Sequence, residues 1–241
     1  MSDIAAESGA EAERWRKQYQ EIAQLAGALA HEIRNPLSTI SMNLKLASEE
    51  IPEDESATSR RLHTKLDTIQ KECDHLENIL NAYLQFVRVG ELDLEPANLN
   101  DLVRQFLEFI KPQATSAQVE ISFHPTADLP AIPVDPVLMK QVLQNLIRNS
   151  LEAMPDGGTI ELQTSCRDSA VHLEVIDNGS GMPKELCEKV FEAFYSRKAG
   201  GSGLGLSTVR KIVEAHGGCI SCESEPGRGT RMTLSFPVAS A

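Results

Sequence analysis

The feature that most constrains the fold is an apolar seam between residues 57 and 89, in which steps of four and three residues alternate. The seam consists of Leu62, Leu66, Ile69, Cys73, Leu76, Leu80, Tyr83 and Val87. This spacing is the heptad pattern of helices that pack along their whole length. A second helical pattern runs from about residue 13 to residue 49, and an acidic segment with Pro52 separates the two.

Two helices with one seam each cannot bury both seams well as a single hairpin. The sequence therefore predicts an antiparallel hairpin that forms a homodimer with a four-helix bundle. The alternative is a monomeric hairpin that the C-terminal half of the chain covers.

After a linker at about residues 92–98, the pattern becomes mixed α/β. Helices are predicted from Asn98 or Asn100 to about residue 111, over residues 136–154 behind an Asp135 cap, and over residues 204–216. Strands are predicted at 119–123, 159–165, 171–176, 219–224 and 230–236. We therefore expect a lead-in at 1–12, a helical domain at 13–95, and an α/β sandwich of a mixed sheet packed on helices at 96–241.

Composition excludes several classes of function. The net charge of −12 disfavours binding to nucleic acid or anionic lipid. No apolar run reaches the ~18–20 residues of a membrane span, and residues 1–4 lack the pattern of a signal peptide, so we expect a cytoplasmic protein. Cys219 and Cys222 form a C-x-x-C motif without a second pair, and on a strand they point to opposite faces, which disfavours a metal site.

The first candidate for chemistry is His31, which precedes Glu32 and lies one helical turn before Asn35. The helical spacing directs the imidazole outward, where a neutral ring nitrogen is a good nucleophile near pH 7. Glu32 can orient the imidazole or take its proton. Pro36 lies inside the same helix at a cost of ~3 kcal/mol, which a purely structural helix would not be expected to carry, and a local kink near His31 is the expected result.

A second group of candidates lies in the α/β half. Asn145 and Asn149 share one face of the helix at 136–154, and an amide oxygen is a suitable ligand for Mg²⁺. Asp177 ends a strand and can accept the amino group of an adenine, while glycines remove side chains beside it. These glycines are Gly179 and Gly181.

A later glycine-rich segment opens the helix at 204–216, where free N–H groups favour a phosphate. It comprises Gly201, Gly203, Leu204 and Gly205. Between the two glycine clusters, Phe194 can anchor a lid over a nucleotide, and Arg197 and Lys198 can neutralise phosphate charge.

In this order, the segments resemble the sensor histidine kinases of two-component signalling, over nearly the whole chain from Tyr19 to Val238. Residues 31–36 look like the phosphoacceptor box and residues 141–150 like the N box. Asp177-x-Gly179-x-Gly181, Phe191-x-x-Phe194 and Gly201-x-Gly203-x-Gly205 look like the next three boxes.

The resemblance implies a Bergerat-type ATP-binding domain in which Asp177 binds adenine with help from Thr230, Asn145 holds Mg²⁺, and Asn149 contacts phosphate. It also implies that His31 is phosphorylated by ATP and passes the phosphoryl group to an aspartate of a response regulator. Asn35 matches a position that orients water for dephosphorylation of that regulator, so a phosphatase activity is a second hypothesis.

One position departs from the pattern, because Glu152 stands where many family members have a lysine. Arg197 or Lys198 is then expected to contact the γ-phosphate. Two rival classes of function remain. The first is an ATPase clamp or a serine kinase of the same ATP-binding superfamily. The second is a non-catalytic dimeric scaffold that only binds nucleotide. No sensor domain is visible in the sequence.

Overall fold

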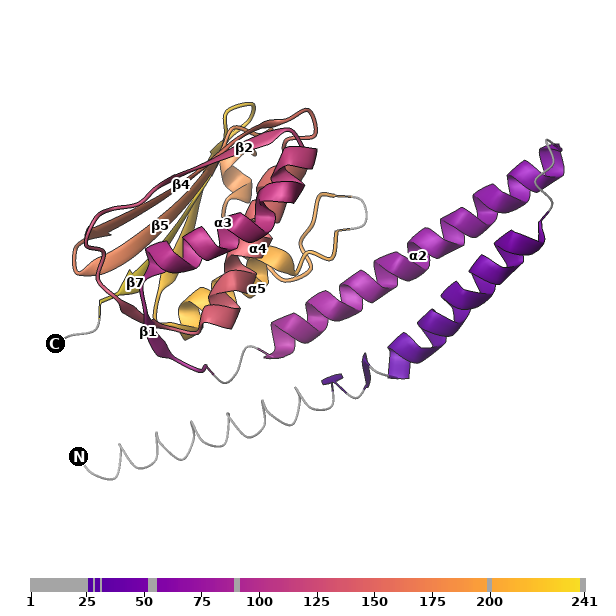
Figure 1. Cartoon of the computed structure of the whole chain (residues 1–241), viewed down its shortest axis with the longest axis horizontal. Coiled ribbons are helices and arrows are strands. Elements are labelled where there is room, and N and C mark those ends of the chain that lie inside the picture. The colour runs from indigo at the N-terminus through magenta and orange to yellow at the C-terminus, as the bar shows by residue number, and fades with distance from the viewer. Residues whose placement is uncertain are drawn as a thin grey trace, which may run out of the picture. The chain divides into compact units, whose positions relative to one another are not determined.

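The computed structural model describes residues 26–27, 29–30, 32–51, 56–88, 92–198 and 201–238. The chain divides into two compact units, a mainly helical unit of residues 1–90 with residues 197–202, and an α/β unit of residues 91–196 and 203–241 (Figure 1).

The helical unit is an antiparallel hairpin, as predicted. Residues 32–50 are helical without interruption at Pro36, and α2 spans Ala57–Arg88. The Ser56 hydroxyl caps α2 by accepting the Ser59 N–H at 3.1 Å. Side-chain hydrogen bonds between described residues join the two helices along their length, including Arg34 to Asn81 at 2.7 Å, Gln70 to Ser41 at 3.2 Å, and Ser48 with His63 at 3.2 Å.

The heptad seam of α2 divides into two rows. Leu66, Cys73, Leu80 and Val87 are buried or half-buried within the hairpin. The alternate positions stay largely open, with exposed fractions of 44% for Leu62, 45% for Ile69, 49% for Leu76 and 36% for Tyr83. The preceding helix behaves in the same way, because Ala26, Ala30 and Leu37 are buried while Leu29, Ile33 and Ile40 are exposed. The hairpin therefore buries only half of its apolar seam.

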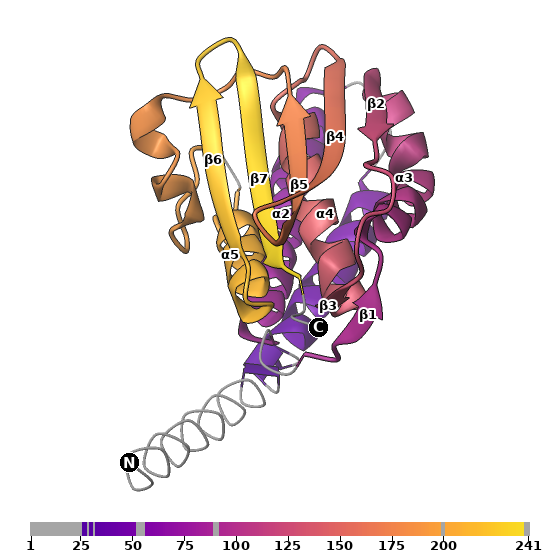
Figure 2. The same cartoon turned by 90° about the vertical axis from the view of Figure 1, so that its left-hand side faces the viewer.

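The α/β unit is a five-stranded mixed sheet with three helices packed against it (Figure 2). The strands are β2 (Val119–His124), β4 (Gly158–Arg167), β5 (Ala170–Asp177), β6 (Cys219–Glu225) and β7 (Gly229–Pro237). They are ordered β2-β4-β5-β7-β6, and only the β2–β4 pair is parallel. The helices are α3 (Leu99–Ser116), α4 (Pro136–Glu152) and α5 (Gly205–Ala215).

The core lies on one face of this sheet. Alternate residues of the central strands are buried there, including Leu162, Leu173 and Leu234, each with no exposed area. The period of two is that of a sheet with one covered face. The predicted α/β sandwich is thus confirmed.

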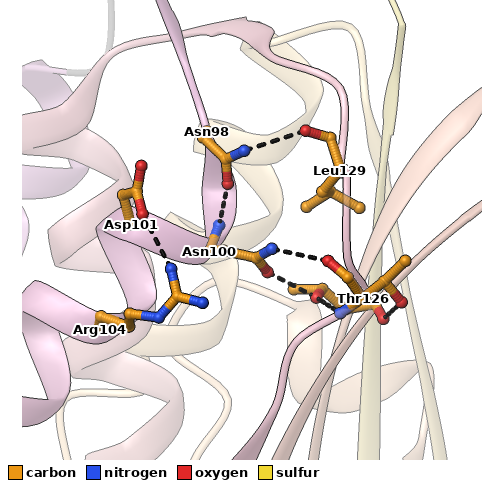
Figure 3. Close-up of polar contacts among 7 residues, drawn as sticks. Asn98, Asn100, Asp101, Arg104, Thr126 and Leu129 are labelled. Atoms are coloured by element: carbon orange, nitrogen blue, oxygen red, sulfur yellow. Dashed lines mark hydrogen bonds and ion pairs between the residues drawn. The ribbon is translucent and has the colours of Figure 1, made fainter.

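A polar network fixes the start of α3 against the sheet (Figure 3). Asn98 caps the helix by accepting the Asn100 N–H at 2.9 Å. The Asn100 amide donates to the Thr126 carbonyl at 2.9 Å and accepts the Thr164 hydroxyl at 2.7 Å. Thr164 also accepts the Thr126 N–H at 3.0 Å. Because every buried group is paired, the network holds the first turn of α3 without a desolvation penalty.

Three features differ from the expectation. The helix α3 runs past residue 111 to Ser116 with Pro112 inside it, because Pro112 lies on the exposed side while Ile110 and Ala114 keep the helix packed. Strands β1 (Glu95–Ala97) and β3 (Ile132–Val134) form an antiparallel pair where only a linker was expected. Two short 3₁₀ turns, Lys184–Leu186 and Lys189–Phe191, precede the aromatic segment.

Candidate functional site

The centre of the candidate site is the Asp177 carboxylate at the end of β5, which is only 8% exposed. Its Oδ1 atom accepts the backbone N–H groups of Gly179 at 3.0 Å and Thr230 at 3.1 Å. Its Oδ2 atom accepts the Ser150 hydroxyl of α4 at 2.9 Å. A carboxylate oxygen accepts two hydrogen bonds, so Oδ2 retains capacity for a donor on a ligand. The carboxylate is therefore fixed in orientation and can still recognise an amino group.

The glycines beside Asp177 permit close backbone approach. A side chain on Gly179 would lie 2.9 Å from the Ala153 carbonyl, at the end of α4. Gly181 has a φ of +60° and Gly229 has a φ of +91°, which favour glycine. A side chain on Gly229 would collide with the Asp177 carbonyl oxygen. These positions let the start of β7 pack directly onto the end of β5.

Thr230 lies opposite Asp177 in the β5–β7 register and is 8% exposed. Its hydroxyl pairs with the Ser224 hydroxyl of β6 at 3.0 Å. Ser224 also donates to the Gly229 carbonyl at 2.8 Å and accepts the Met182 N–H at 2.9 Å. Thr230 is thus brought to Asp177, as the resemblance implies.

The two asparagines of α4 lie on the side of the helix that faces the start of α5. Asn145 is 8% exposed and Asn149 is half-buried. The Asn145 Oδ1 atom lies 3.2 Å from the point where a side chain on Gly205 would begin. Asn149 is one turn farther along the same helix, directly before Ser150. The α4 helix therefore joins the Asp177 carboxylate to the first turn of α5.

The start of α5 has the features of an anion site. Leu204 precedes the helix, its side chain makes no capping hydrogen bond, and it is completely buried. The Phe194 N–H donates to the Gly203 carbonyl at 3.0 Å, which closes the base of the loop at 195–202. Arg197, Lys198 and Gly201 lie in this loop, where both basic side chains are exposed, and their role in the site remains a prediction.

The phosphoacceptor segment is only partly described. His31 lies outside the described residues, so its predicted orientation remains a prediction. Glu32 and Asn35 are exposed on the helix, and the Thr39 hydroxyl donates to the Asn35 carbonyl at 3.0 Å. The predicted kink at Pro36 is untested.

Two site residues were missed by sequence reasoning. Ser150 bonds directly to Asp177, and Arg148 donates from its NH2 atom to Asn145 Oδ1 at 3.3 Å. Helical spacing was a signal for Arg148, which lies three residues after Asn145, but not for Ser150, which directly follows Asn149.

The two cysteines of the C-x-x-C motif lie on opposite faces of β6, as predicted. Cys219 contacts Ser235 at 3.4 Å between Sγ and Oγ on the open face of the sheet, whereas Cys222 faces the interior. Burial, and then the neighbouring Cys187 thiol, raise the pKa of Cys222 to about 12. Among the described residues there is no group of three or more His, Cys, Asp or Glu side chains that could hold a metal ion. None of the helices in the described ranges is long and apolar enough to cross a membrane.

Comparison with known proteins agrees with this geometry. Residues 21–92 match the His Kinase A (phospho-acceptor) domain, and residues 134–240 match the histidine kinase-, DNA gyrase B- and HSP90-like ATPase family. The sensor histidine kinase ZraS of Klebsiella oxytoca is 36% identical over 94% of this chain and 50% of its own length.

Solved structures of two other histidine kinases are also similar. Full-length ShkA in complex with AMPPNP superposes with a TM-score of 0.70 at 29% identity, over 90% of this chain and 46% of ShkA. The catalytic domain of ThkA gives a TM-score of 0.56 at 31% identity, over 61% of this chain and 98% of that domain. ThkA in complex with the response regulator TrrA gives 0.67 at 27% identity, over 95% of this chain and 66% of the matched chain.

The chain spans about half the length of these curated ZraS relatives. Its two domain matches occur in the order expected from the five sequence boxes. The chain therefore belongs to the sensor histidine kinases of two-component signalling.

Proposed function

We propose that this chain is an ATP-dependent protein-histidine kinase that phosphorylates its own His31 and passes the phosphoryl group to an aspartate of a response regulator. The observation that best supports this function is the arrangement around α4. One end of this helix supports the buried Asp177 carboxylate through Ser150, and Asn145 in its middle lies beside the start of α5. A base-recognising carboxylate and an anion site are thereby joined by one rigid element.

The roles of the residues follow from their surroundings. Asp177 Oδ2 accepts the exocyclic amine of adenine, and Thr230 supports the base. Asn149 contacts a phosphate, and the N–H groups at the start of α5, after Gly203 and Leu204, bind the phosphate chain. The loop at 195–202, with Phe194 at its base and Arg197 and Lys198 within it, acts as the lid.

Asn145 is suited to hold Mg²⁺, because its amide oxygen is a hard ligand. When bound, the ion would neutralise part of the negative charge of the phosphates. Asn145 is nearly buried and so holds its amide in a fixed position, which fits this role.

In the reaction, a neutral ring nitrogen of His31 attacks the γ-phosphorus of ATP. The N–P bond forms as the bond from the γ-phosphorus to the β–γ bridging oxygen breaks, and ADP leaves. The attacking nitrogen carries no proton, and Glu32 takes the proton of the other ring nitrogen after the N–P bond has formed. Asn35 positions water for hydrolysis of the regulator's acyl phosphate, which would make the same chain a phosphatase.

A homodimer is part of this proposal. The open rows of the hairpin, formed by Leu62, Ile69, Leu76 and Tyr83 with Leu29, Ile33 and Ile40, are suited to pack against a second copy. The helical domain at 13–95 then carries dimerisation and the acceptor, and the domain at 96–241 carries ATP. The reaction is placed in the cytoplasm, where ATP and a response regulator are available.

Incubation with γ-labelled ATP and Mg²⁺ tests the function. We expect base-stable, acid-labile label on the wild-type chain and none on His31→Gln. Asp177→Asn should also abolish labelling, because its amide can place an N–H where adenine offers one. Release of phosphate without labelled protein would indicate the ATPase clamp instead, and nucleotide binding with neither product would indicate the scaffold.

A further inference from the structure

The Arg148 side chain is placed beside the predicted phosphate end of the site. Arg148 belongs to α4 and lies between Asn145 and Asn149 in the sequence. About half of its side chain is exposed. Its NH2 atom lies 3.3 Å from Asn145 Oδ1, and its Nε atom lies 3.8 Å from Glu152 Oε1. The same NH2 atom is 3.5 Å from the point where a side chain on Gly205 would begin, at the first residue of α5. Arg148 thus lies at the contact between α4 and the start of α5.

The bond from Arg148 to Asn145 conflicts with a metal ion at the same oxygen. A Mg²⁺ ion binds its oxygen ligands at about 2.0–2.1 Å, so a guanidinium on that oxygen would lie within a few ångströms of the ion. Two cations at this distance repel each other, even at a site as exposed as the Arg148 side chain. The two therefore cannot both use Asn145 Oδ1.

A nearby phosphate chain resolves this conflict. The guanidinium is planar, permanently charged and well matched to two phosphate oxygens. The Arg148 side chain is long and half-exposed, so it can turn from Asn145 towards the start of α5 without moving the backbone. Glu152 competes for the same guanidinium and adds a negative charge close to the phosphates.

We propose that Arg148 binds the phosphate chain of the nucleotide, and that it occupies Asn145 Oδ1 until Mg²⁺ and nucleotide arrive together. This inference rests on the proposed function, because it assigns one more residue to the same nucleotide site. It places the phosphate-binding cation on the rigid helix α4, in addition to the basic residues of the lid.

The test compares Arg148→Gln and Glu152→Gln with the wild-type chain. Dissociation constants for ATP with Mg²⁺ and for adenosine are measured by isothermal titration calorimetry. We expect Arg148→Gln to weaken ATP about tenfold or more, because a charge-assisted bond to phosphate is lost, and to change adenosine less than about twofold. Glu152→Gln should tighten ATP about two- to fivefold, because it frees the guanidinium and removes a repelling charge.

The matched control is Arg104→Gln, which removes the same charge from an exposed ion pair with Asp101 on α3. We expect it to bind ATP as the wild type does. An ATP affinity of Arg148→Gln within twofold of the wild type would overturn the inference. An equal loss for adenosine would also overturn it, because the residue would then support the fold of the site. In either case the wild type still binds ATP, whereas a wild-type chain that binds no ATP refutes the proposed function itself.

Discussion

The open apolar row of α2 gives the sharpest quantitative prediction. Ile69 is 45% exposed in the single chain, so a partner helix can bury about half of its side chain. Full burial of an isoleucine is worth roughly 1.5–3 kcal/mol, so the half that remains is worth about 1 kcal/mol. Replacement by glutamate removes this gain and places a carboxylate in an apolar contact, at a further cost of at least ~1 kcal/mol.

A dimer carries the substitution twice, so Ile69→Glu should weaken association by at least ~4 kcal/mol. This corresponds to a dissociation constant raised about a thousandfold. Sedimentation velocity over about two decades of protein concentration measures the shift, and far-UV circular dichroism checks that the helices persist.

Thr64→Glu is the matched control, because Thr64 is exposed and lies about 140° round the same helix from Ile69. It adds the same charge outside the seam and should leave the dimer intact. The reasoning is refuted if Ile69→Glu associates as tightly as the wild type, or if Thr64→Glu dissociates equally.

Three further predictions concern the α/β unit. Thr164→Val removes a hydroxyl from the network of Figure 3 and takes a hydrogen-bond partner from the buried Asn100 amide oxygen and from the part-buried Thr126 N–H. The free energy of unfolding in urea should therefore fall by about 2–4 kcal/mol, and a change below about 0.5 kcal/mol would contradict this account. In the same assay, Gly229→Ala should lower the free energy of unfolding by more than about 2 kcal/mol, because Gly229 has a left-handed φ and a side chain there would collide with backbone. The control Gly227→Ala, with a φ of +74° and open space around it, should lower it by about 1–2 kcal/mol. Equal losses would argue against the collision. The pKa of the Cys222 thiol is raised to about 12, so at pH 8 its thiolate fraction should be roughly a thousandfold lower than that of an ordinary cysteine. Cys222 should therefore react with iodoacetamide far more slowly than the exposed Cys166, which mass spectrometry can measure. Comparable rates would refute the raised pKa.

The longer helices and strands could be predicted from the sequence, because burying one face of an element produces a regular spacing of apolar residues. Strands β4 and β5 alternate clearly and extend only one or two residues beyond the predicted limits at each end. The β1–β3 pair could not be predicted in this way, since each strand has three residues and Pro96 pairs with Pro133 in the register. Neither proline donates a hydrogen bond, so the local sequence is typical of a linker.

In the candidate site too, residues could be predicted from local sequence but not from contacts between distant segments. Asp177 and Asn145 were predicted because their residue types suit a nucleotide and they lie in recognisable boxes, whereas Thr230 was predicted only from the resemblance to the family. Arg148 was missed because its significance lies in a contact with α5, more than fifty residues later in the chain. The division of the seam into a closed and an open row was also not predicted, because heptad spacing alone does not say which row faces which helix.

The unequal lengths of α4 and α5 have a consequence for charge. The two helices are antiparallel, because the start of α5 lies beside Asn145 while His216, just after its end, accepts the Asp135 N–H at 2.9 Å through Nε2. The 11 residues of α5 therefore lie alongside the first part of the 17-residue α4, whose last two turns continue about 10 Å farther. The partial positive charge at the start of α5 is thus not cancelled by the terminal carbonyl groups of its neighbour. Because α4 extends beyond the start of α5, the positive end of α5 remains available to an anion. The last turns of α4, which carry Arg148 and Asn149, lie beside this position.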